Sequence, residues 1–244
     1  MKFTKTMLIA ALCAVANFAN AKETMNEKTD RVYKELFKAE RTASPTDPEL
    51  LETLQRYIFG EVFFVGDLDN KTRELITVSS LAALQTLPQL KAHINGALNA
   101  GNTPLEVREA IYACAPFIGY PRTLNAVGAF NEVAKSRGIE LPLESAAGTE
   151  RKRLDETASA KDAAKAFYAD YASRGGLEQK KRELLALVVA TALGAKDEAE
   201  HRIKTNLKIG NGKDVLTAAI VQAMPYIGAP AAMKTIEEIK EVEK

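Results

Sequence analysis

An internal repeat constrains the fold of this chain more than any other feature. When the sequence is shifted by 109 residues, residues 66–121 align with residues 175–230 without a gap, and 18 of the 56 aligned pairs are identical. Shared glycines and prolines carry the most weight, because each marks a helix boundary. These pairs are Gly66/Gly175, Gly101/Gly210, Gly119/Gly228, Pro116/Pro225 and Pro121/Pro230. We therefore expect two tandem copies of one domain.

The repeat also sets the expected domain boundaries. The first domain is expected over residues 22–140 and the second over residues 163–244. Residues 141–162 contain Pro142, Gly148 and charges of both signs, a composition typical of a linker.

Each copy carries helical periodicity and helix boundary signals, and no alternating strand pattern with hairpin turns occurs in the sequence. Thr103 and Glu106 form a capping box around Pro104, which suits the first turn of a helix. The helices expected in the first copy are residues 30–38, 49–57, 72–85, 88–100, 104–119 and 121–138. The predicted fold class is all-α, two tandem helical-bundle repeats.

The N-terminal segment has the pattern of a signal peptide. Two lysines, Lys2 and Lys5, precede an apolar run over residues 7–19, and Ala19-Asn20-Ala21 fits the small-x-small cleavage rule. We expect residues 1–21 to be removed and the mature protein to be exported, to the periplasm; an uncleaved membrane anchor is the alternative. Removal would leave Cys114 as the single thiol, so no intrachain disulfide is expected.

The composition excludes two common classes of site. The chain has 33 basic and 32 acidic residues, so no electrostatic basis exists for expecting a nucleic acid partner. With two histidines and two cysteines in all, a zinc site is not expected either, and we predict no metal and no cofactor.

His93 and Glu74 are the candidate catalytic residues. Histidine gains and releases a proton near neutral pH, and His93 has apolar neighbours at the positions that share its helix face. Glu74 lies on an otherwise apolar helix face, where a carboxylate can relay a proton. The alternative interpretation of His93 is a hydrogen-bonded core histidine. The alternative for Glu74 is a first-turn glutamate that the helix dipole stabilises.

Three further residues are weaker candidates for contacting a substrate. Arg73 and Arg122 carry the guanidinium group that holds a carboxylate, although both also suit surface ion pairs. Cys114 is a candidate nucleophile, although a lone cysteine on an apolar face is commonly a small core residue. Because Arg202 and Ala223 occupy the positions of His93 and Cys114 in the repeat, the first copy is expected to supply the main site residues.

Four segments of the first copy resemble the carboxymuconolactone decarboxylase family, within the AhpD-like superfamily. They are RELITV (residues 73–78), HINGALNAG (93–101), TPLEVREA (103–110) and FIGYP (117–121). The resemblance implies a helical bundle that assembles as trimers or hexameric rings. The superfamily includes cofactor-free decarboxylases of 4-carboxymuconolactone and alkylhydroperoxidases of the peroxiredoxin type.

The resemblance separates these two activities. The peroxidase branch uses a glutamate, a Cys-x-x-Cys pair and a histidine, and those positions fall here on Glu74, Thr86, Gln89 and His93. Without the two thiols, disulfide exchange has neither an attacking nor a resolving sulfur. The peroxidase activity is therefore disfavoured, although a general description of the superfamily would include it.

The decarboxylase branch implies a carbon–carbon lyase that acts on a small lactone or cyclic carboxylic acid. In that reaction His93 acts as general acid and Glu74 orients its imidazole, while Arg73 or Arg122 orients the substrate carboxylate. A non-catalytic binding or scaffold protein is the remaining alternative. Two joined copies also imply a homo-oligomer, a trimer of two-domain chains that imitates a six-copy ring.

The sequence alone does not determine whether Glu74 and His93 lie in contact within one chain. The two residues lie 12 and 7 residues from the turn at Thr86. In a simple helical hairpin they would sit at depths that differ by roughly 7 Å. They meet only if the helices cross steeply or if a neighbouring subunit supplies one of them.

Overall fold

The computed structural model describes residues 23–242, and all regular structure within this range is helical. The all-α prediction is confirmed; the predicted signal peptide lies outside the described residues. The first part of the chain contains α2 (Met25–Phe37), α3 (Pro48–Gln55), the short helices η1 (Arg56–Glu61) and η2 (Val62–Phe64), α4 (Asn70–Leu84), α5 (Leu87–Asn99), α6 (Pro104–Ala113) and α7 (Ala115–Ser136). The second part contains α8 (Ala160–Ala172), α9 (Gln179–Ala192), α10 (Lys196–Lys208), α11 (Lys213–Ile227) and α12 (Ala229–Glu241).

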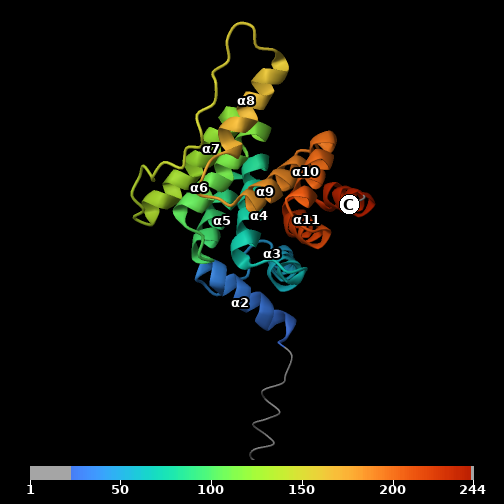
Figure 1. The fold of residues 1–244 in the computed structure, drawn as a ribbon. Helices are drawn as coiled ribbons and strands as arrows, with labels where there is room; N and C mark the ends of the chain where they lie inside the picture. The colour runs from blue at the N-terminus through green and yellow to red at the C-terminus, as the bar shows by residue number, and fades with distance from the viewer. Residues whose placement is uncertain (1–22, 243–244) are drawn as a thin grey trace, which may run out of the picture.

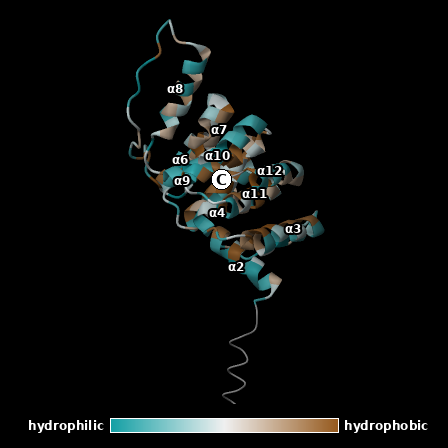
Figure 2. Ribbon diagram, turned by 45° about the vertical axis from the view of Figure 1, so that its right-hand side comes forward, coloured by the Kyte–Doolittle hydropathy of each residue, from teal (hydrophilic) through white to brown (hydrophobic). Residues whose placement is uncertain are grey.

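Helices α4 and α9 correspond to each other in the repeat and form the centre of the molecule (Figure 1). Residues 72–83 of α4 and 182–191 of α9 are buried on every side. A helix that is enclosed all round needs neighbours on every face, and here each copy covers the other's central helix. One continuous apolar core therefore joins the two copies, and Figure 2 shows hydrophobic residues gathered where the central helices meet.

Corresponding residues of the two copies make the same local contacts. Asn102 donates a hydrogen bond to the carbonyl of Lys71 at 3.0 Å, and Asn211 donates one to the carbonyl of Lys180 at 2.9 Å. The turn before each asparagine contains a glycine with positive φ, 98° at Gly101 and 88° at position 210. The repeat in the sequence is thus a repeat in the fold.

Several predicted helix boundaries differ from the observed ones. α2 begins at Met25, five residues before the predicted start, because Thr24 and Glu27 form a capping box at that point. α6 ends at Ala113 and α7 begins at Ala115, so a break at Cys114 divides the helix that was predicted over residues 104–119. The predicted break at Gly119 is also present, because this residue is not helical. Gly119 has φ 75° and ψ 165°, and it kinks α7 near its start.

The segment between α7 and α8 crosses from one copy to the other. α8 begins at Ala160, inside the predicted linker, where Ser159 and Asp162 form its capping box. The preceding segment is fixed to α8 by Arg151, which donates two hydrogen bonds of 2.8 Å to Asp170.

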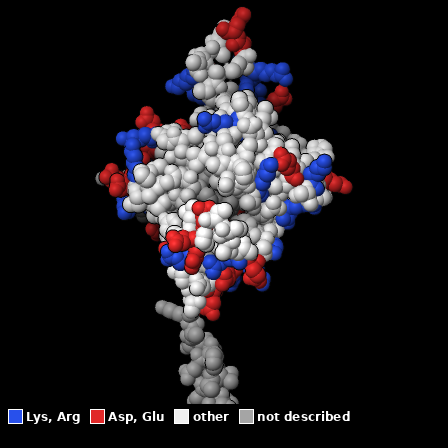
Figure 3. All heavy atoms as spheres, turned by 180° about the vertical axis from the view of Figure 1, so that it is seen from behind, with Lys and Arg blue, Asp and Glu red and all other residues white. Residues whose placement is uncertain are grey.

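The surface carries charges of both signs. On the face seen in Figure 3, acidic and basic side chains are scattered around the outline, and uncharged surface covers the middle. No helix within residues 23–242 combines the length and the apolar character that crossing a membrane requires. In the same range, no three metal-ligating side chains cluster.

Candidate active site

Glu74 and His93 are in direct contact within one chain. Glu74 lies on α4 and His93 on α5, and the His93 Nδ1 atom lies 3.0 Å from Glu74 Oε2. The glutamate side chain is fully buried, and the histidine side chain keeps 9% of its exposure. Of the two arrangements that the sequence left open, the structure has the one in which neighbouring helices bring the pair together, so the contact needs no second subunit.

Gly96, one turn beyond His93 on α5, makes this contact possible. A Cβ atom at position 96 would lie 2.6 Å from Glu74 Oε2, closer than any side chain tolerates. The missing side chain therefore lets the Glu74 carboxylate reach the surface of α5 beside the imidazole. Gly96 lies in the family-like segment HINGALNAG, but nothing in its sequence context indicates which side chain would occupy the space that it leaves.

Two aromatic rings enclose the imidazole of His93. The ring of Phe37, at the end of α2, stands edge-on to it with a centroid distance of 5.7 Å. The ring of Tyr226, near the end of α11, does the same at 5.4 Å. Since Tyr226 belongs to the second copy, the site in the first copy is completed by the other half of the chain. Sequence analysis missed both rings.

Two polar atoms at this site lack hydrogen-bond partners among the described residues. They are Glu74 Oε1, an acceptor, and the hydroxyl of Tyr226, a donor, and both are buried. Burial raises the pKa of Tyr226, and the negative charge of Glu74 raises it further. The nearby Thr77 side chain lowers this pKa by less. The hydroxyl therefore keeps its proton and is available to donate. Unsatisfied buried groups are rare, and two of them in one site indicate where a ligand or water would bind.

The contact with Glu74 sets the role of each imidazole nitrogen. A carboxylate oxygen only accepts, so Nδ1 carries a hydrogen and donates it to Glu74 Oε2. Nε2 makes no hydrogen bond within the described residues and is the atom that can exchange a proton with a bound molecule.

The corresponding place in the second copy has different chemistry. Arg202 stands where the first copy has His93, and its Nη1 atom lies 3.0 Å from Glu183 Oε2. Its Nε atom donates to Glu198 at 2.7 Å. The guanidinium lies against Phe117, at 5.3 Å from the ring centroid. Arginine stays protonated, so this place offers no acid–base group of the kind that His93 provides.

A sequence profile of the carboxymuconolactone decarboxylase family matches residues 48–132 and, again, residues 158–241. The chain belongs to this family. The predicted membership and the tandem duplication are therefore confirmed, and the site with Glu74 and His93 lies in the first family match.

Two named relatives match part of the chain. It is 34% identical over 86 residues to 4-carboxymuconolactone decarboxylase of Acinetobacter baylyi, and 33% identical over 87 residues to nitrosuccinic acid decarboxylase npaB of Metarhizium robertsii. The matched stretches span 35% and 36% of this chain, and 64% and 61% of the two relatives. The chain thus spans less than two thirds of the length of either relative.

Arg73, a predicted substrate contact, is buried and binds backbone carbonyl groups of its own chain. Its side chain is 2% exposed and donates hydrogen bonds to the carbonyls of Val65, Gly66 and Leu68, each at 3.0 Å. Burial lowers the pKa of the guanidinium. Its donors fix the chain segment that leads into α4, whereas the expectation that Arg73 holds a substrate carboxylate stays a prediction.

Within the described residues, no hydrogen bond joins Arg122 or Cys114 to Glu74 or His93. Arg122 is exposed on α7, and its carbonyl accepts a hydrogen bond from Gln85. Cys114 is buried, its thiol lies 3.3 Å from the carbonyl of Ala110, and burial raises the pKa of the thiol to about 12. Buried and with its thiol protonated, Cys114 is not an accessible nucleophile in this structure. The substrate contact expected of Arg122 stays a prediction.

Proposed function

We propose that the protein is a decarboxylase that acts on a small lactone or cyclic carboxylic acid without a cofactor, with His93 as general acid. The observation that carries this proposal is the buried contact of 3.0 Å between Glu74 and His93. It supports a group that delivers a proton in a site largely closed to water.

The proposed reaction replaces a carboxylate with a hydrogen. As the bond to the carboxylate breaks and CO2 leaves, its electron pair stays on the carbon atom. Nε2 of the imidazolium form of His93 delivers a proton to that carbon, and His93 regains a proton from solvent afterwards. Glu74 holds the imidazole in place through Nδ1, and its negative charge stabilises the imidazolium, an attraction that is stronger in a buried site than in water.

The names of the two relatives support the substrate class. One is a decarboxylase of 4-carboxymuconolactone and the other of nitrosuccinic acid. Both substrates are small carboxylic acids, and we propose the same class here. The hydroxyl of Tyr226 supplies a buried donor for an oxygen atom of such a substrate.

We further propose that residues 1–21 direct export to the periplasm and that the mature chain forms a trimer. The pattern of the N-terminal segment and the two joined copies support these proposals. The mass of the protein recovered from the periplasm tests the first, and light scattering coupled to size exclusion tests the second.

The decisive experiment measures CO2 release from 4-carboxymuconolactone and from a panel of small lactones, cyclic acids and succinates. Purified wild type is compared with H93A, and with H201A as the matched control, because His201 is an exposed histidine of α10. We expect at least one substrate to be consumed by wild type and H201A, and H93A to be slower by about 10²–10⁴-fold. Consumption by none of the three proteins, or by all at one rate, would overturn the proposal.

A further inference from the structure

The space beside the buried arginine of each copy is filled in the first copy only. There, Arg73 Nη1 donates to Gln222 Oε1 at 3.3 Å, and Gln222 Nε2 donates to Thr77 at 3.3 Å. The corresponding arginine of the second copy is Arg182. The positions that correspond to Gln222 and Thr77 are both alanine, Ala113 and Ala186.

These two alanines leave a cavity of about 30 Å³ beside Arg182. Its charged lining residues are Arg182, Arg202 and Glu183, and its other walls include Ala113, Ala186 and Phe117. At roughly 10–15 Å³ for each water, this volume holds about two waters or a group of two or three heavy atoms. The cavity thus occupies the place that the glutamine and the threonine fill in the first copy.

Arg182 has donors without partners at this place. Its side chain is 4% exposed, and Nη2 donates to the carbonyls of Arg174 and Gly175 at 2.9 and 3.2 Å. Nε and Nη1 are fully buried and have no hydrogen-bond partner within the described residues. Since Nη1 of Arg73 points to Gln222, the repeat places Nη1 of Arg182 toward Ala113 and the cavity.

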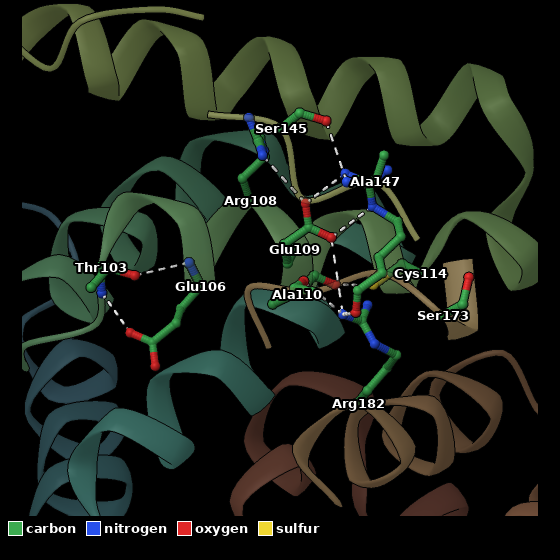
Figure 4. A network of polar contacts seen from close by, with 12 residues as sticks. Thr103, Glu106, Arg108, Glu109, Ala110, Cys114, Ser145, Ala147, Ser173 and Arg182 are labelled. Carbon is green, nitrogen blue, oxygen red and sulfur yellow. Dashed lines mark hydrogen bonds and ion pairs between the residues drawn. The ribbon is translucent and has the colours of Figure 1, made fainter. Parts of the chain in front are cut away.

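The nearby carboxylates are already neutralised by other arginines. Glu109 accepts two hydrogen bonds of 2.8 Å from Arg174, and a third of 3.4 Å comes from Arg108. Arg182 approaches Glu109 only to 4.0 Å, and Figure 4 shows Arg108 and Arg182 both directed toward this single carboxylate. Glu183 is paired with Arg202. A buried guanidinium beside a cavity is therefore left without a counter-charge of its own, which is costly.

We propose that the cavity beside Arg182 is a binding site for a small monoanion, of the size of a chloride ion or a formate. The anion accepts a hydrogen bond from Nη1 of Arg182 and supplies the missing negative charge. This site is separate from the proposed decarboxylation at His93 and does not depend on it.

The test follows the melting temperature of the full chain during titration with sodium formate and, separately, sodium chloride. Ionic strength is kept constant with a bulky organic salt. A ligand that binds only the folded state raises the melting temperature in a saturable way. We expect such a rise for wild type with at least one of the two anions, and the anion that gives it identifies the occupant.

The variant A113Q introduces the residue that stands at the corresponding position of the second copy, Gln222, which lies beside Arg73. Its side chain fills the cavity and accepts from Nη1, so we expect a folded protein that melts higher than wild type without added anion and no longer responds to it. The matched control is A163Q, on the exposed face of α8, which keeps the wild-type response. Equal responses in wild type and A113Q would reveal an adventitious ion only. That result, or no saturation with either anion in wild type, overturns the proposal.

Discussion

The ring of Tyr226, from the second copy, stands edge-on to the imidazole of His93, from the first, at a centroid distance of 5.4 Å and an angle of 84°. The reciprocal contact exists as well, because Phe117 of the first copy lies against Arg202 of the second. Tyr226 and Phe117 occupy corresponding positions of the repeat. Each copy therefore closes the site of the other.

Removing the Tyr226 hydroxyl separates its role in binding from its role in packing. In Y226F the ring remains and the unpartnered buried hydroxyl disappears, so we expect the melting temperature to stay constant or rise. If the hydroxyl donates to the substrate, kcat/KM falls by about tenfold, as expected for one lost hydrogen bond. Steady-state kinetics and thermal unfolding check this, and unchanged kinetics would exclude the contact.

A single methyl group on α5 should break the pair. In G96A the new Cβ would meet Glu74 Oε2 at 2.6 Å, so the carboxylate has to move away from His93. We expect turnover to be lost and stability to fall by about 1–3 kcal/mol. The control is G128A on α7, where an added Cβ meets no atom within 4 Å and stability stays constant or increases. Similar behaviour of the two variants would show that Gly96 has no special role.

The buried carboxylate of Glu109 should matter far more to stability than an exposed one. In E109A the guanidinium of Arg174 loses the carboxylate to which it donates two hydrogen bonds, and we expect a loss of about 3–5 kcal/mol. The control D170A breaks the half-exposed pair with Arg151 and should cost far less than E109A. Urea unfolding measures both, and equal losses would contradict this view of the cluster.

Burial of Cys114 predicts a pH dependence of stability. The folded state raises the pKa of this thiol to about 12, whereas the unfolded chain releases the proton above about pH 8.5. The unfolded state then binds fewer protons than the folded state, so stability falls as the pH rises above that value.

Between pH 7 and pH 10, wild type should lose about 2 kcal/mol more than C114A, which has no thiol. Urea unfolding at both pH values measures the difference, in which any packing effect of the substitution cancels. Identical losses would mean that the thiol ionises freely in the folded state. Alanine is also the residue at position 223, the corresponding place in the second copy, so the fold accepts it there.

Local signals made most of the fold predictable. The capping box of Thr103 and Glu106 begins α6 where the sequence indicates, and the repeat alone predicts the two-copy arrangement. The position of Arg73 was not predictable, because its partners are backbone carbonyls whose direction depends on the folded segment before α4. Tyr226 is separated from His93 by most of the chain, and no local pattern links two rings that meet only after both copies have packed.

Joining the two copies in one chain has an evolutionary consequence. In an assembly of identical single copies, every substitution would appear in all sites at once. Here a mutation at position 202 changes one site and leaves position 93 untouched, so one copy is free to lose acid–base chemistry while the other retains it. A substitution at the aromatic positions 117 or 226 affects both copies, because each ring belongs to one copy and contacts the site of the other.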